Sequence, residues 1–161
     1  MSAVLSNPSV ERVRTALCAA GLAPDIVELP GAARTALAAA QFLGCEPAQI
    51  ANSLVFRAQA SDGAVLVMSS GAKRVSTAKL ATLVGEPIGK ADADFVRHHT
   101  GFAIGGVAPA GHLGDLRRYV DRSLAVHAEI WAAAGHPSTV FKLTYTDLVR
   151  ITGGAEVDLA E

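Results

Sequence analysis

The hydrophobic residues of this chain follow helical spacing in some segments and strand-like spacing in others. Val10, Val13 and Leu17 lie three and four positions apart after an Asn-Pro pair, which predicts a helix that ends near Gly21. Further helices are expected to follow side chains that can cap a helix N-terminus, namely Thr35, Ser76, Asp92 and Thr144. Apolar runs between turn signals predict extended segments at 26–29, 50–57, 64–69, 102–106, 118–121, 129–132, 139–143 and 156–159.

These helices and strands do not alternate regularly along the chain. Such an order favours an α+β fold with a mixed sheet over a doubly wound parallel sheet. The 161 residues suit a single domain, 1–161, and half of them are hydrophobic, so we expect a packed core. No internal repeat, low-complexity tract or linker divides the sequence.

Composition narrows the cellular setting of the protein. No run of about 18 or more apolar residues occurs, so no membrane span is predicted. The N-terminal segment has neither a basic start nor an apolar stretch, which disfavours a secretory signal. Cys18 and Cys45 lack CxxC spacing and are expected to be buried thiols in a reducing compartment. These features together predict a cytoplasmic protein.

The charge balance speaks against a general nucleic-acid binder. The formal net charge is −1, and DNA is therefore not an expected partner. Local basic faces are still available, and for each of them a solvated surface is the commoner explanation. The candidate clusters are Arg12 with Arg14, Lys73 and Arg74 with Lys79, and Arg117 with Arg118.

A polar pair, Asn52 and Ser53, interrupts the otherwise apolar strand at 50–57. Burying an amide and a hydroxyl costs a few kcal/mol unless they form hydrogen bonds, so the pair either satisfies a neighbouring loop or faces a cleft. Two loops rich in glycine and proline, 105–111 and 135–138, could complete such a pocket, because glycine lets backbone N–H groups approach a ligand closely. The alternatives are an ordinary tight connection at the first loop and a structural role for His136 in the second.

Other kinds of chemistry lack the residue spacing they need. The histidines form no HxxxH or HExxH pattern and no cysteine pair accompanies them, so no metal site is expected. No phosphate-binding loop or dinucleotide fingerprint predicts a cofactor, and no GxSxG elbow predicts a serine nucleophile. The residues present favour a pocket of neutral polar side chains and backbone N–H groups.

Taken in order, these motifs resemble the YbaK/EbsC family, the prolyl-tRNA-synthetase-associated editing domains. The resemblance rests on the helix at Thr35, the segment 49–57, the loops 105–111 and 135–137, and Leu143-Thr144 before the last helix. It implies a curved, partly barrel-like mixed sheet flanked by helices. It also implies a trans-acting deacylase without a cofactor, which hydrolyses the ester between a wrong amino acid and a tRNA, often proline tRNA. Expected partners are an aminoacyl-tRNA and an aminoacyl-tRNA synthetase.

The resemblance also implies roles for individual residues. Gly105 and Gly106 would belong to the loop whose backbone N–H groups contact the scissile ester, and His136 to a loop beside the amino-acid side chain. The catalytic set is then Asn52, Gly105 and Gly106, and the substrate-binding set is Ser53, Thr35, Pro109, His136 and Pro137.

Two positions depart from the family's pattern. The family usually carries a lysine where this chain has Asn52, and an amide lacks the charge that makes a hydrogen bond roughly twice as strong. Ala133 stands where the family's first glycine before Pro137 would fall. The sequence therefore leaves two functions open: a deacylase that acts mainly by positioning, and a module that binds an aminoacyl group without turnover.

Overall fold

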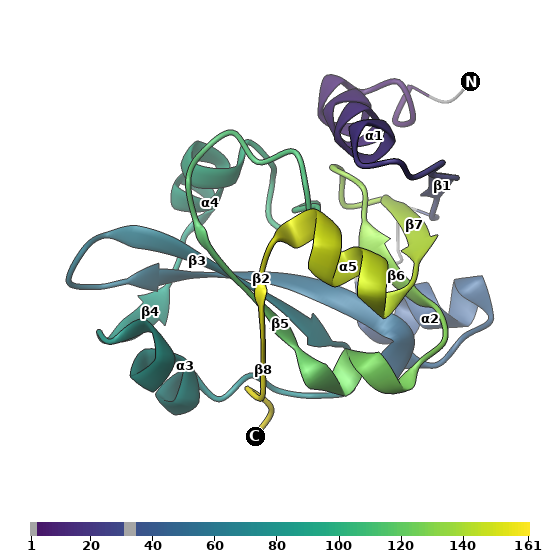
Figure 1. The fold of residues 1–161 in the computed structure, drawn as a ribbon. Coiled ribbons are helices and arrows are strands. Elements are labelled where there is room, and N and C mark those ends of the chain that lie inside the picture. Colours follow the sequence, from purple (N-terminus) through teal and green to yellow (C-terminus); the bar gives the residue numbers. More distant parts are fainter. Residues whose placement is uncertain (1–2, 31–34) are drawn as a thin grey trace.

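A mixed β-sheet forms the centre of the molecule, and helices pack on both of its faces (Figure 1). The computed structural model describes residues 3–30 and 35–161. The strands are β1 (Val27–Glu28), β2 (Ile50–Ala58), β3 (Gly63–Ser70), β4 (Ile88–Lys90), β5 (Arg117–Asp121), β6 (Ile130–Ala133), β7 (Thr139–Leu143) and β8 (Ala155–Val157). The helices are α1 (Pro8–Ala19), α2 (Ala36–Leu43), α3 (Thr77–Val84), α4 (Ala93–Thr100) and α5 (Tyr145–Thr152), with short 3-10 turns η1 (Pro47–Gln49) and η2 (Arg122–Val126).

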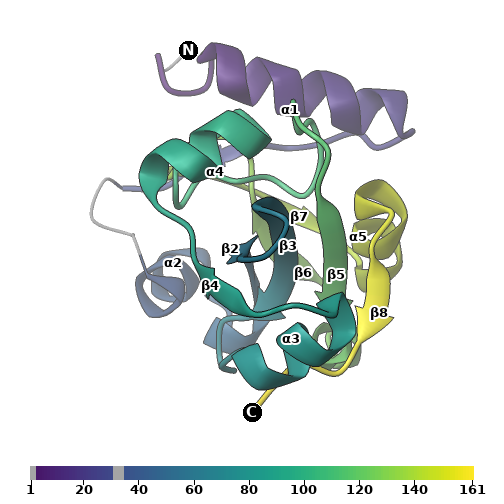
Figure 2. The ribbon, with the colours of Figure 1, turned by 90° about the vertical axis from the view of Figure 1, so that its left-hand side faces the viewer.

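The strand order confirms the expected α+β class with a mixed sheet. The main path runs β1-β7-β6-β2-β3-β5-β8, and β4 pairs with β2 beside this path. The β2–β6, β3–β5 and β5–β8 pairs are parallel, whereas β1–β7, β6–β7, β2–β3 and β2–β4 are antiparallel. This path does not return to its starting strand, so the sheet is open rather than a closed barrel. Figure 2 shows α2 and α5 on opposite sides of it.

The central strand β3 is buried on both faces. Leu66 and Met68 pack in the larger hydrophobic cluster, which also contains Leu148 of α5. The alternate residues Val65 and Val67 point the other way and pack in a separate cluster. This arrangement follows from the period of two along a strand, and the near-continuous apolar run of β3 is the pattern expected of a strand covered on both sides.

The helix starts lie where the sequence predicts them. The Asn7, Thr35, Ser76, Asp92 and Thr144 side chains each accept a hydrogen bond from a backbone N–H two or three residues further on. These bonds satisfy N–H groups that have no partner within the helix, which is why such residues mark helix boundaries reliably. The C-terminal ends of α2, α3, α4 and α5 are each closed by a glycine in the left-handed conformation.

One expected strand is absent and one short strand was not expected. Residues 102–106 form turns rather than a strand, because the Thr100 hydroxyl accepts a hydrogen bond from the Phe102 N–H and the Gly106 N–H bonds to the Ala103 carbonyl. The prediction of an extended segment there is wrong. Conversely, β4 forms because it pairs with the far end of β2. This long-range contact cannot be predicted from the three residues of β4 alone.

The cysteines also differ from expectation. Cys18 is exposed on α1 and Cys45 is half-buried after α2, so the prediction of two buried thiols is wrong. Cys18 directly follows the core residue Leu17 and therefore falls on the outer face of α1. Within the described part of the chain, no helix is both long enough and apolar enough to cross a membrane.

Candidate active site

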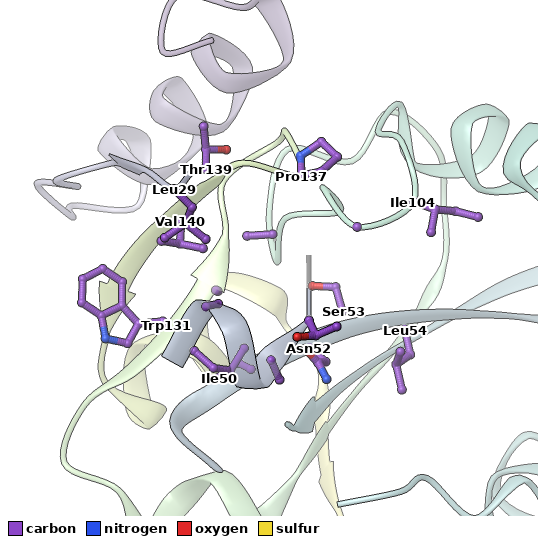
Figure 3. Close-up of a pocket in the computed structure, with 17 residues that line it drawn as sticks. Leu29, Ile50, Asn52, Ser53, Leu54, Ile104, Trp131, Pro137, Thr139 and Val140 are labelled. Carbon is purple, nitrogen blue, oxygen red and sulfur yellow. The ribbon is translucent and has the colours of Figure 1, made fainter. Parts of the chain in front are cut away.

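The polar interruption of β2 lies in a cavity of about 330 Å³. In Figure 3, Asn52 and Ser53 occupy the middle of this pocket, with Trp131, Leu29 and Val140 on one side and Ile104 on the other. The sites predicted from the sequence that line it are Thr35, Asn52, Ser53, Gly105 and Pro137. The structure thus brings five of the eight predicted site residues to one place, from α2, β2 and the two loops.

The pocket lies at a gap in the sheet beside β2. On one edge β2 pairs with β6 only at Ile50 and Ala51, and with β4 only from Phe56 to Ala58. Residues 52–55 therefore pair with β3 alone among the described strands. A second cavity of about 180 Å³ adjoins the first along this gap and shares Ser53, Leu54, Ile104 and Gly105 with it.

The pairing pattern decides which backbone groups face the gap. Ile50 accepts a hydrogen bond from Gly71, directly across the β2–β3 pair, so the even-numbered residues of β2 bond to β3. In an antiparallel ladder the intervening residues point their N–H and C=O groups the other way. The backbone groups of Ser53 and Val55 consequently point into the gap, where both donors and acceptors are available to a ligand.

The side chain of Asn52 is free to contact a ligand. It is half-buried, and its amide forms no hydrogen bond with any described residue. Directly across from it on β3 lies Ser69, which is 1% exposed and whose hydroxyl also has no partner within the described part of the chain. The Ser53 hydroxyl, by contrast, is 3.3 Å from the Met68 sulfur, a weak acceptor. Ser53 therefore offers the pocket its backbone more than its side chain.

The two glycine-rich loops touch one another above the pocket. A Cβ added to Gly106 would lie 2.8 Å from the His136 carbonyl carbon, so only glycine allows this approach. Gly105 has φ +88°, a conformation that glycine adopts without strain, and it faces Pro137. The Gly106 N–H is used in the turn to Ala103, whereas the Gly105 N–H has no partner among the described residues. Of the two N–H groups proposed for the scissile ester, that of Gly105 is the available one.

His136 and Pro109 occupy other positions. His136 does not line the pocket; its Nδ1 accepts the Ser138 N–H at 3.0 Å and its backbone N–H donates to the Thr139 hydroxyl at 3.2 Å. These bonds shape the loop that carries Pro137 into the site. Pro109 is buried and lines a separate cavity together with His112.

The pocket is electrically neutral as far as the structure describes it. None of its described lining residues carries an ionisable side chain, and its walls are mainly Ala, Leu, Ile, Val and Trp. In the same part of the chain, no group of three or more His, Cys, Asp and Glu side chains is arranged to hold a metal ion. The described residues of the site can offer hydrogen bonds and shape, but no general base.

Among the lining residues that the sequence did not predict as site residues, Ile104 and Trp131 are the most prominent. Ile104 is 56% exposed at the mouth of both cavities, and the half-buried Trp131 lies beside Ile50 across the β2–β6 pair. Ile104 directly precedes the predicted loop, and Trp131 is the single tryptophan of the chain. The sequence signal for Ile104 was an apolar residue directly before a glycine pair; its exposure became known only from the structure.

Comparison with known proteins shows the family to which the chain belongs. A model of the aminoacyl-tRNA editing domain matches residues 31–151, which include all eight predicted site residues. The chain therefore belongs to the aminoacyl-tRNA editing domain family, and the resemblance to YbaK-type editing domains is confirmed.

Individual relatives agree with this assignment. The uncharacterised protein YwhH of Bacillus subtilis (strain 168) is 29% identical over 140 residues, which cover 87% of this chain and 88% of the relative. The crystal structure of a candidate trans-editing enzyme for prolyl-tRNA synthetase is 44% identical, has a TM-score of 0.89, and aligns over 96% of this chain and 98% of its own. A scaffold protein used for computational epitope backbone grafting is 42% identical with a TM-score of 0.90, over 96% and 99% of the two chains.

Proposed function

We propose that this protein is a trans-acting aminoacyl-tRNA deacylase of the cytoplasm, which hydrolyses the ester of a mischarged tRNA. Its partners are then an aminoacyl-tRNA, with proline tRNA as the first candidate, and the synthetase that produced the error. Membership of the editing-domain family supports the general activity, and similarity to the candidate trans-editing enzyme for prolyl-tRNA synthetase supports the choice of tRNA. The observation that carries the proposal is the free Asn52 amide beside the unpaired edge of β2 and the Gly105 N–H.

The chemistry follows from hydrogen-bond donors rather than from charge. Water adds to the ester carbonyl carbon, the ester C–O bond breaks, and the amino acid leaves the terminal hydroxyl of the tRNA. In this proposal the Gly105 N–H donates to the carbonyl oxygen as it becomes negative; one such donor is typically worth about 10²–10³ in rate. Asn52 orients the carbonyl or the attacking water. The aminoacyl ester is already reactive, so a pocket whose described lining residues include no general base can still accelerate its hydrolysis.

The remaining predicted residues shape the binding of the aminoacyl group. Thr35 and Pro137 form parts of the pocket wall, and Ser53 offers its backbone N–H and C=O. His136 supports the Pro137 loop and contacts the amino-acid side chain only if that side chain reaches past the wall. Pro109 acts from outside the pocket, through the loop that also carries Gly105.

Purified protein and mischarged tRNAs provide the test. We expect release of the amino acid from at least one of proline tRNAs charged with alanine, cysteine, serine or threonine, measured as loss of acid-precipitable label. Correctly charged prolyl-tRNA serves as the control and should be hydrolysed more slowly. Rates equal to spontaneous hydrolysis on the whole panel would refute the deacylase.

A second function is favoured by one observation, the absence of ionisable side chains among the described lining residues. A binding module would hold the aminoacyl group in the same pocket without turnover. It predicts tight, saturable binding of a non-hydrolysable aminoacyl-adenosine amide by a protein that fails the deacylation panel.

A further inference from the structure

A separate polar cavity, the one that Pro109 lines, lies on the opposite side of the sheet from the candidate active site. It has a volume of about 430 Å³, opens to the surface, and is lined by α1, the loop 109–112, the start of β5 and the C-terminal end of α5. Figure 2 shows β5 descending from beside α1 past α5. The side chains that give this cavity its chemistry are His112, Arg118 and Arg150. None of them takes part in the site described above.

Positive charge exceeds negative charge around this cavity. Arg150 is paired with Asp147 at 3.3 Å, one turn earlier on α5. Arg118 forms no ion pair with a described residue. Neither does Arg12 of α1, which instead donates to the backbone carbonyls of Gly111 and Gly101 at 2.9 and 2.7 Å. Arg118 thus lines the cavity without a carboxylate partner, and the unpaired charge of Arg12 lies behind its wall, bonded to the lining residue Gly111.

His112 holds Arg118 without neutralising it. The imidazole Nε2 lies 2.7 Å from the Ala108 carbonyl oxygen, to which it can only donate, so Nδ1 is the acceptor for the Arg118 Nε at 3.3 Å. Burial lowers the pKa of His112 to about 4, and this keeps the ring neutral. The Leu116 carbonyl accepts from Arg118 Nη1 at 3.4 Å. A guanidinium fixed by two neutral acceptors keeps its full charge for a ligand.

We propose that this cavity binds a phosphate group through Arg118, with Arg150 and Arg12 contributing charge. A planar guanidinium presents parallel N–H donors that match two phosphate oxygens, and such charge-assisted pairs are the stronger hydrogen bonds of proteins. No acidic side chain lines the described cavity to repel an anion. The phosphate has two sources, a free phosphate compound or the backbone of an RNA; the RNA source rests on the proposed function, and the anion site itself does not.

Inorganic phosphate tests the site without any tRNA. We expect phosphate, compared with chloride at equal ionic strength, to shift the backbone amide NMR signals of residues 110–112 and 150–153. Arg118→Gln should abolish these shifts, and Arg118→Lys should restore them in part. Arg97→Gln, which removes the same charge from an exposed position on α4, should leave them intact. Wild-type protein without such shifts up to about 50 mM phosphate would overturn the phosphate site, whatever the variants do.

Uncharged tRNA then distinguishes the two sources. If the cavity holds a backbone phosphate, Arg118→Gln weakens tRNA binding and lowers the slope of log affinity against log salt by about 0.7–0.9, the share of one phosphate contact. If tRNA binding matches that of Arg97→Gln while the phosphate shifts are lost, the ligand is a free phosphate compound. Neither assay involves ester hydrolysis, so a failed deacylation panel leaves this proposal standing, and a failed phosphate titration leaves the deacylase standing.

Discussion

At the scale of single residues, the centre of the candidate site is an amide, at a position where the resemblance to the YbaK/EbsC family implies an ammonium group. Asn52 has an uncommitted side chain, and Ser69 beneath it has a buried hydroxyl without a partner among the described residues. A buried polar group without a hydrogen bond costs about 1–3 kcal/mol, and among the described residues this applies to the Ser69 hydroxyl. The half-buried Asn52 amide remains free to bind substrate.

Substitution of Asn52 measures how much the missing charge matters. Asn52→Lys should raise deacylation of at least one mischarged tRNA by roughly 10- to 150-fold, because a charge-assisted contact realised only in the transition state is worth about 1.5–3 kcal/mol. Asn52→Ala should lower the rate by roughly 2- to 13-fold, the equivalent of one neutral hydrogen bond of about 0.5–1.5 kcal/mol. Gln41→Ala, which removes an exposed amide on α2, should change nothing. Wild-type hydrolysis that is indifferent to both Asn52 variants would place the active site elsewhere.

At the scale of elements, the contact between the loops at 105–111 and 135–138 sets the upper wall of the pocket. The two loops can approach this closely only because Gly106, which lies against the backbone of His136, has no side chain. Backbone cannot rotate out of the way as a flexible side chain can, so any larger residue must move one loop.

We therefore expect Gly106→Ala to reduce deacylation more than its effect on stability explains. The added methyl group displaces Pro137 or Gly105, and NMR shifts at 135–137 should report the movement. Gly44→Ala is the matched control: Gly44 closes α2 with φ +71° and open space around it, so alanine there costs about 1 kcal/mol of stability without touching either loop. If Gly106→Ala and Gly44→Ala had equal melting temperatures and lost equal activity, a positioning role for the contact between the loops would be contradicted.

The elements also show what a sequence can and cannot reveal. The caps at Thr35, Ser76 and Thr144 fixed their helix boundaries, because capping involves only neighbouring residues. The polar pair at Asn52 was predictable as a pocket residue, since polar groups seldom interrupt an apolar strand without a purpose. The gap beside it was not, because it arises from where two distant strands, β6 and β4, stop pairing with β2. The separate position of Pro109 likewise depends on the path of a loop through space.

At the scale of the whole molecule, a neutral, half-buried histidine, His112, links α1, β5 and the loop that reaches the pocket. Burial lowers the pKa of His112 to about 4, the charges of Arg118 and Arg12 act in the same direction, and the bond to the Ala108 carbonyl opposes them. The unfolded chain takes up this proton near pH 6.5, before the folded protein does. The unfolded state is then favoured as the pH falls from about 6.5 towards 4.

The free energy of unfolding should accordingly decrease over this interval by up to about 1.4 kcal/mol per pH unit from His112 alone. Denaturant unfolding of wild type and His112→Gln at pH 7.0, 6.0 and 5.0 measures it. The variant is expected to be less stable at pH 7 and to have a flatter pH dependence. His98→Gln, at an exposed position on α4, should follow the wild type. Parallel curves for wild type and His112→Gln would refute the contribution of this residue.

The position of the gap in the sheet also affects the tendency of the protein to aggregate. Unpaired strand edges are the places where folded proteins recruit further strands and aggregate. Here the open edge of β2 covers residues 52–55 only and lies inside the sheet, with β6 before it, β4 after it and Ile104 and Gly105 beside it. An incoming strand would need a longer, flatter edge at the rim. The protein can therefore keep unpaired backbone donors for a small ligand in the middle of its sheet without exposing them to another protein chain.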